Sequence, residues 1–532
     1  MQNYQNPAYP SVLSGRTLVR RSTLTLTSTL RLALVCILLL ALALRFWGLA
    51  FGLPYIVQPD EPSVEGRALD MWLKGNPDAH YYVYPSFFYD LQALWAILVG
   101  HVAALVSPDI LRHPRAHLPA YYLAGRALTA LMGTLTVLVT YLTGRRLAPR
   151  LGLIAALFLA VAAQHVQQSH YITVDAPTAL FTALAALFAV RALTGESARR
   201  DIVLAGLAAG LAGGTKYNAG VALTLPLAAA LLTHARSWRW RLGVSAAATA
   251  VAAVVFALSI PFALRDWSDF VTSMTVVPRH YMTGHPGAEG NDNAVWYLLY
   301  LARDGMLAPM TLLAVAGLVA VVARYRRAGV VLLAFALPYY AVLCGTYVRF
   351  DRNLLPLLPF LALFAAAAAE AVMPPVIRAL RNHVAAYAIV LGVAVVPSLY
   401  VAAYAGTQSD FAITHPFSEE AAVAWVDAHA ANGATIATEN WEGRPFGLSP
   451  RRYRIINHGT ITAETYDWYR AHGVRYIVVD SYTDDAYLRS PRRYPVEAAR
   501  YRELYRRGRL LQRITGDSPL RPGPTMSIYG AP

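Results

Sequence analysis

The chain has 532 residues, of which 56% are hydrophobic and only 14% are charged. A soluble chain of this length would need far more polar surface, so the composition predicts a polytopic membrane protein. The formal net charge of +15 is carried mainly by short basic clusters between apolar stretches. That distribution is typical of membrane orientation signals, and we expect no nucleic-acid partner.

The first apolar stretch, residues 32–51, has the ~20 residues that a transmembrane helix needs. It follows an arginine-rich leader and is long enough to remain as an anchor, so we expect no cleaved signal peptide. Basic residues stay on the cytoplasmic side of a membrane, which places the N-terminus in the cytoplasm. Cys36 and Cys344 both fall in apolar stretches, which excludes a disulfide framework or a cysteine-based metal site.

Residues 84–106 are apolar enough to be taken for a second span. If they crossed the membrane, Arg145, Arg146 and Arg150 would lie outside, against the charge rule, so we predict a helix on the membrane surface. Ten further spans then follow, and each loop expected in the cytoplasm is short and basic. With the first stretch they make eleven; the ten lie at about 122–142, 151–166, 176–192, 202–214, 217–233, 242–262, 306–323, 329–345, 353–372 and 384–404.

The chain becomes polar after residue 404, and its last part is long enough for a separate domain. Helical patterns at 419–431, 463–472 and 496–507 alternate with strand patterns at 434–439, 474–480 and 525–529. We therefore divide the chain into a cytoplasmic segment 1–30, a transmembrane domain 31–405 and an α/β domain 406–532. An odd number of spans places that last domain outside a cytoplasmic membrane that the chain crosses many times.

An acidic pair, Asp60-Glu61, stands between Pro59 and Pro62 just past the first span. One interpretation is a solvated turn, because prolines and acids are common in turns. The other is a general base that faces a lipid-linked substrate. A transporter or lipid flippase is an alternative for the whole chain, but it would place ionisable groups in mid-membrane and show internal repeats, and little of either is present. A membrane scaffold that binds glycan is a third interpretation.

The order of the polar segments expected outside resembles the polytopic GT-C glycosyltransferases, in particular the protein O-mannosyltransferase and lipid A aminoarabinose transferase group. Those families carry Asp-Glu early in the first outer loop, and further features follow in the same order. The matching segments here are Asp60-Glu61, the aromatic run 80–86 with Tyr84-Pro85, Arg126, Asp175 before Ala176-Pro177, Thr215-Lys216, and 349–359 with Arg349 and Arg352.

The resemblance covers about residues 30–405 and implies sugar transfer from a polyprenyl-phosphate donor to a hydroxyl of a lipid, glycan or protein acceptor. A phosphate is a fair leaving group, so the chemistry needs a base for the acceptor proton and cations for the phosphate. We predict Asp60 as the base, because partial desolvation at the membrane edge favours proton uptake, with Glu61 orienting the acceptor or tuning Asp60. The predicted phosphate-binding residues are Lys216, Arg349, Arg352 and Arg126.

Asp175 has two interpretations of equal weight, a helix N-cap before Ala176-Pro177 and a second acidic group that faces the substrate. Tyr84, His280 and His285 are further substrate-site candidates, although a membrane-interface or solvated role explains each of them more simply. The two families show His-Pro-Pro or Glu-Lys-Pro where this chain has Tyr84-Pro85-Ser86 and Val83. No tight metal-ligand spacing is present, so no cofactor is assigned, and a divalent metal is left as an alternative.

Overall fold

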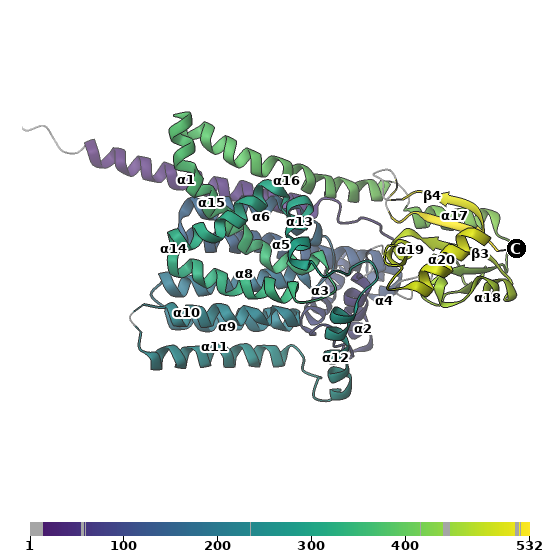
Figure 1. Cartoon of the computed structure of the whole chain (residues 1–532). Coiled ribbons are helices and arrows are strands. Elements are labelled where there is room, and N and C mark those ends of the chain that lie inside the picture. Colours follow the sequence, from purple (N-terminus) through teal and green to yellow (C-terminus); the bar gives the residue numbers. More distant parts are fainter. Residues whose placement is uncertain are drawn as a thin grey trace, which may run out of the picture.

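The computed structural model describes residues 14–54, 58, 60–234, 236–414, 417–439, 447–516, 521 and 523–531. Pro59 and the start of the predicted segment 1–30 lie outside this range. A bundle of long helices leads to a smaller domain that holds the C-terminus (Figure 1). The bundle helices are α1 (Ser14–Phe46), α5 (Leu118–Leu147), α6 (Pro149–Val161), α8 (Asp175–Thr194), α9 (Ala198–Thr215), α10 (Thr224–Leu232), α11 (Trp238–Leu258), α14 (Leu307–Cys344), α15 (Leu358–Leu380) and α16 (His383–Thr414).

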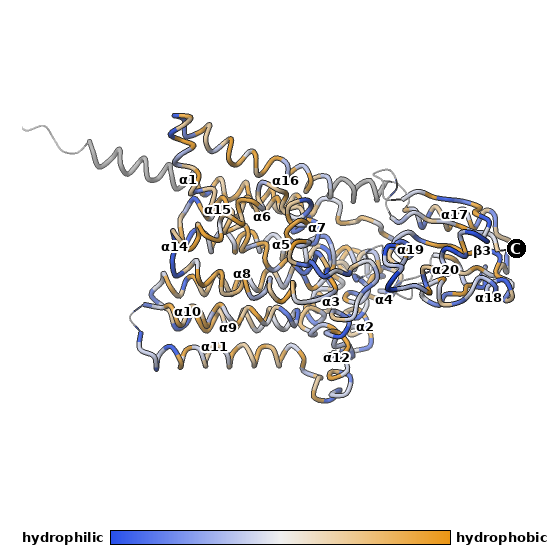
Figure 2. The backbone as a smooth tube through the Cα atoms, in the orientation of Figure 1, coloured by the Kyte–Doolittle hydropathy of each residue, from blue (hydrophilic) through white to orange (hydrophobic). Residues whose placement is uncertain are grey.

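The apolar composition of these helices agrees with the predicted membrane protein. Eight helices in the described part of the chain are long and apolar enough to cross a membrane, and Phe87–Ala104, predicted as a surface helix, is one of them. The hydrophobic residues run along the bundle, and the polar ones gather at its loops and in the C-terminal domain (Figure 2). The predicted spans at 151–166, 202–214 and 217–233 fall on helices that are shorter or less apolar, of which α6 is almost wholly buried by its neighbours.

Helix α14 supplies two of the predicted spans. Its backbone is non-helical at Arg326, where φ is 34°. A Cβ atom on Gly329 would lie 2.6 Å from the carbonyl oxygen of Val321, so the two halves double back and pack closely. The close approach is possible because glycine at position 329 has no side chain.

Short helices cover the end of the bundle that faces the C-terminal domain, which we call the domain end (Figure 1). Helix α3 (Phe87–Ala104), predicted as a surface helix, lies there. Just before α3, the Ser86 amide donates to the Ser259 carbonyl at 2.9 Å, directly after α11. Gly100 near its other end packs on Tyr121 at the start of α5. Both ends therefore touch the same end of the bundle, so α3 runs across that end. Nearby are η1 (Pro62–Gly66), α2 (Arg67–Lys74), α4 (Asp109–Arg112), η2 (Pro114–His117), α7 (Ala163–Gln168), η3 (Tyr217–Leu223), α12 (Trp267–Thr283), α13 (Asn293–Tyr300), η4 (Leu301–Gly305) and η5 (Asp351–Leu357).

The C-terminal domain is an α/β unit, as predicted, built on a five-stranded sheet in the order β2-β1-β3-β5-β4. Strands β2, β1 and β3 are parallel, and β5 and β4 are antiparallel to their neighbours. Alternate residues of β3 enter two separate apolar clusters, Ile477 and Val479 in one and Val478 in the other, so helices cover both faces. Its elements are α17 (Ser418–His429), β1 (Thr435–Thr438), β2 (Arg454–Ile456), η6 (Ile461–Ala463), α18 (Tyr466–Ala471), β3 (Val474–Asp480), α19 (Ser481–Leu488), α20 (Pro495–Arg507), β4 (Arg509–Ile514) and β5 (Met526–Gly530).

Buried acids make the stability of this domain pH-dependent. Burial raises the pKa of Glu419 to about 7, and the charge of Asp480 adds to the effect. The folded state therefore holds a proton that the unfolded chain releases above its ordinary pKa, so stability decreases as pH rises from 5 to 8. We expect Glu419→Gln to remove roughly 1–2 kcal/mol of this loss, read from thermal unfolding of the full chain at several pH values. Equal pH slopes in the wild type and the variant would contradict the assignment.

Candidate active site

The acidic pair stands directly before η1, with Pro62 as its first residue. A proline at that position loses no helical hydrogen bond. The two side chains diverge: Glu61 is fully buried, whereas the Asp60 side chain is 26% exposed. The solvated-turn interpretation therefore does not hold for Glu61, and of the two acids only Asp60 is open to a reacting molecule.

Glu61 is held by Arg126 in a buried bidentate ion pair. Arg126 donates from Nε to Oε1 at 2.8 Å and from Nη2 to Oε2 at 2.7 Å. Its Nη1 donates to the carbonyl oxygens of Leu49 and Phe51, just past α1, at 2.8 and 2.7 Å. The guanidinium is fully buried, which does not suit the predicted contact with a donor phosphate. Instead, the ion pair between Arg126 and Glu61 links the segment that carries Asp60 and Glu61, and the end of α1, to α5. It therefore positions Asp60.

Asp60 pairs with Arg352, which η5 presents from a part of the chain almost 300 residues away. The distance from Nη1 to Oδ2 is 2.9 Å, and the arginine side chain is 25% exposed. The Phe350 ring lies under the guanidinium at 4.5 Å. Tyr84 lies within electrostatic reach of both partners, and burial raises the pKa of its phenol well above the usual range. The partly exposed Asp60 carboxylate therefore faces the partly exposed Arg352 guanidinium, beside the protonated phenol of Tyr84.

Asp175 and Lys216 form a second buried pair next to this one. Lys216, just after α9, donates from Nζ to Oδ1 of Asp175 at 2.6 Å and to Oδ1 of Asn353 at 2.7 Å. All three residues are at most 4% exposed. Asp175 is the first residue of α8 and Val174 is its N-cap, so the prediction of Asp175 as the N-cap residue is wrong.

Asn353 is the member of this group that sequence reasoning missed. It follows Arg352 directly in η5, so the Lys216 ammonium holds the segment that carries the Asp60 partner. The Tyr339 hydroxyl donates to the Asn353 carbonyl at 3.1 Å and restrains the same turn. The polar residues between two apolar stretches were the available signal, but nothing in the chain order links Asn353 to Lys216.

The predicted histidines and Arg349 lie in a neighbouring group. His285 Nδ1 is 3.2 Å from His280 Nε2, and its ring packs on Phe350 with centroids 5.0 Å apart. Burial, with smaller contributions from His280 and Arg352, lowers the pKa of His285 to about 4, so the ring is neutral at physiological pH. Arg349 pairs with Asp292 at 2.7 Å and not with Asp60 or Asp175.

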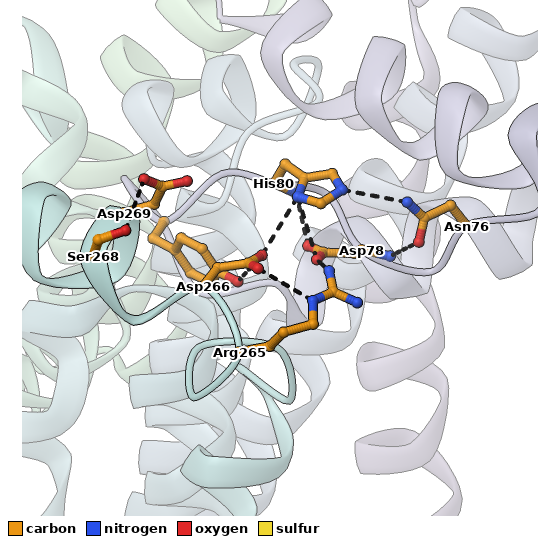
Figure 3. Close-up of polar contacts among 8 residues, drawn as sticks. Asn76, Asp78, His80, Arg265, Asp266, Ser268 and Asp269 are labelled. Carbon is orange, nitrogen blue, oxygen red and sulfur yellow. Dashed lines mark hydrogen bonds and ion pairs between the residues drawn. The ribbon is translucent and has the colours of Figure 1, made fainter.

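A different group of side chains offers ligands for a metal ion. Figure 3 shows Asp78, His80 and Asp266, whose ligand atoms all lie within 4.8 Å of one another. The Arg265 side chain pairs with both carboxylates, and its hydrogen bond is the main cause that lowers the pKa of Asp266 to about 2. Carboxylate and imidazole ligands suit several divalent metals. This is a candidate metal site, but an ion there would have to displace the exposed guanidinium.

The arrangement of the bundle agrees with that of solved membrane enzymes. The fold is similar to the crystal structure of ArnT from Cupriavidus metallidurans bound to undecaprenyl phosphate, with a TM-score of 0.56 and 16% identity over 93% of this chain and 97% of that one. The chain has the GT-C fold. The archaeal oligosaccharyltransferase AglB from Archaeoglobus fulgidus, in complex with an inhibitory peptide and a dolichol-phosphate, matches this GT-C fold with a TM-score of 0.53 and 14% identity, over 88% of this chain and 72% of that one.

The sequence comparison points to the same class of enzyme. Residues 70–273 match the family model described as dolichyl-phosphate-mannose-protein mannosyltransferase, and no curated protein sequence matches the chain. Together, the GT-C fold and the family match indicate a multi-pass membrane glycosyltransferase. The matched segment includes Tyr84, Arg126, Asp175 and Lys216, whereas Asp60 lies before it and Arg352 after it.

Proposed function

We propose that the protein is an inverting glycosyltransferase that moves a sugar from a polyprenyl-phosphate donor to an acceptor hydroxyl at the domain end of the bundle. The observation that carries the proposal is the contact of Asp60 with Arg352, which places a partly exposed carboxylate against a partly exposed cation. Undecaprenyl phosphate in the ArnT structure and dolichol-phosphate in the AglB structure support a lipid-phosphate donor. The acceptor is a lipid, glycan or protein, and the domain end faces the outside of the cytoplasmic membrane.

The reaction needs one direct displacement. The acceptor oxygen attacks the anomeric carbon, the bond from that carbon to the phosphate oxygen breaks, and Asp60 takes the acceptor proton. The polyprenyl phosphate leaves with the bonding electrons, and the Arg352 guanidinium stabilises its charge. A single displacement from the opposite face inverts the configuration.

The remaining pairs have positioning roles in this proposal. Arg126 and Glu61 hold the backbone that carries Asp60, and Lys216 with Asn353 holds the turn that carries Arg352. Lys216 and Arg126 are buried, whereas Arg352 is partly exposed. In this proposal Arg352 is therefore the cation that contacts the phosphate. Asp60, Glu61 and Asp175 each have a cationic partner within 3 Å, so no step is assigned to a metal ion.

The donor contact is tested by transfer of radiolabelled sugar from a panel of polyprenyl-phospho-sugars, using the purified full-length protein and Arg352→Gln. Loss of the cation should lower kcat/KM for the donor roughly 10- to 100-fold, the range for one charge-assisted contact. The matched control is Arg303→Gln, an exposed arginine that pairs with Asp304, and its activity should stay close to wild type.

Two results would count against this proposal. Equal activity of Arg352→Gln and Arg303→Gln would remove Arg352 from the donor site. No transfer by the wild-type protein from any donor in a broad donor and acceptor panel would remove the proposed reaction.

A further inference from the structure

We propose that the bundle binds an anionic phospholipid at the end opposite to the C-terminal domain, in a pocket between the first turns of α9 and α11. The pocket has a volume of about 540 Å³ and is lined by Arg199, Arg200, Arg236, Glu196, Trp240 and Val203, among others. The first turns of α9 and α11 lie at the end of the bundle that is opposite to the C-terminal domain (Figure 1), whereas the proposed active site is at the domain end. The inference therefore does not depend on the proposed reaction.

The packing of α9 and α11 explains why both helices begin at this pocket. A Cβ atom on Gly206 would lie 2.4 Å from the Ala248 carbonyl oxygen, and one on Gly210 would lie 2.7 Å from that of Ala252. Both contacts advance by four residues in the same direction, so the two helices run parallel. Their N-terminal ends lie side by side, and both helix dipoles present positive charge to the pocket.

The side chains at this place add formal positive charge. Three arginines line the pocket against one glutamate, Glu196. Arg200 pairs with Asp201 at 3.3 Å, whereas no carboxylate in the described part of the chain pairs with Arg199 or Arg236. The Arg236 guanidinium lies 5.1 Å from the centre of the Trp240 ring. Two arginines and two helix ends are therefore available to one anionic group, for which a phosphate is well suited.

The apolar part of the pocket distinguishes a lipid from a soluble phosphate. Val203 and Trp240 line it beside the arginines, and Leu207, one turn further along α9 from Val203, is 39% exposed. Helix α11 is long and apolar enough to cross a membrane, and its first residue is Trp238. A phosphate on the arginines would therefore place acyl chains along α9 within the hydrocarbon region. Basic pockets between membrane helices are typical binding sites for anionic headgroups.

The test is lipid binding by the purified full-length protein in a neutral detergent, measured by native mass spectrometry. Phosphatidylglycerol, phosphatidylcholine, undecaprenyl phosphate and inorganic phosphate are compared as ligands or competitors. We expect the protein to prefer phosphatidylglycerol, and Arg199→Gln/Arg236→Gln to weaken its binding by roughly 30-fold, from the usual contribution of two basic residues at a membrane surface. The matched control, Arg239→Gln/Arg324→Gln, removes the same charge outside the pocket lining and should change binding less than about threefold.

Four other results would overturn the proposal. Equal weakening in both double variants would show a general charge effect, and equal binding of phosphatidylcholine would remove the need for an anionic headgroup. Displacement of the lipid by millimolar inorganic phosphate would show a site for a soluble anion, and preference for undecaprenyl phosphate would show a second donor site. If the double variant does not fold, the single variants Arg199→Gln and Arg236→Gln should each weaken binding about fivefold.

Discussion

Asp60→Asn should lower kcat for sugar transfer by roughly 10²- to 10⁴-fold, the contribution of a positioned general base. Asparagine has nearly the same shape but takes up no proton from the acceptor. Asp60 is the member of the acidic pair that is partly exposed, while both carboxylate oxygens of Glu61 are bound by Arg126. The measurement is single-turnover transfer at saturating donor by the purified full-length protein.

The matched control for this experiment is Asp269→Asn, an exposed aspartate on α12 at the same end of the bundle. It should keep close to wild-type activity. An Asp60→Asn protein with the wild-type thermal stability and more than about a tenth of the wild-type kcat would exclude Asp60 as the base.

Arg126→Met should have the largest effect on stability, a loss of about 3–5 kcal/mol. The substitution leaves the Glu61 carboxylate fully buried without its cation, which is the costly way to break a buried ion pair. The carbonyl groups of Leu49 and Phe51 also lose their donor. The loss is measured as the decrease in Tm and in folded yield of the full-length protein in detergent.

Two comparisons make this prediction specific. Arg115→Met breaks an exposed ion pair with Asp70 and should cost less than about 1 kcal/mol. Adding Glu61→Met to Arg126→Met should recover part of the lost stability, because the second change removes the unpaired buried charge. Equal Tm values for Arg126→Met and Arg115→Met would contradict a central role for the pair.

The geometry of the site separates residues that the sequence treats alike. Asp60 and Glu61 are adjacent acids, yet a single turn of backbone directs one to Arg352 and the other to Arg126. Lys216 and Arg352 were both predicted to bind phosphate, but only Arg352 is partly open. This difference comes from burial, which depends on helices that lie far apart along the chain.

Much of the architecture follows from the sequence because membrane insertion is a local property. Apolar stretches of the right length form helices wherever the lipid leaves no other way to satisfy the backbone, and the short strand patterns at 434–439, 474–480 and 525–529 predicted three strands of the C-terminal sheet, β1, β3 and β5. The order of the polar segments between those helices was enough to identify the GT-C resemblance and to single out Asp60. The helices and strands depend on neighbours within a few residues, and the resemblance depends only on the order of segments along the chain.

Only the tertiary structure decided which charges meet. The partners Asp60 and Arg352, Glu61 and Arg126, and Lys216 and Asn353 are separated by 65 to 292 residues, and no periodicity links them. Helix packing also decided that α9 and α11 begin side by side, through glycines that let two backbones touch. Local pattern determines which segments become helices, but the low dielectric of the packed interior determines which buried charges must pair, and so which cation remains for a substrate.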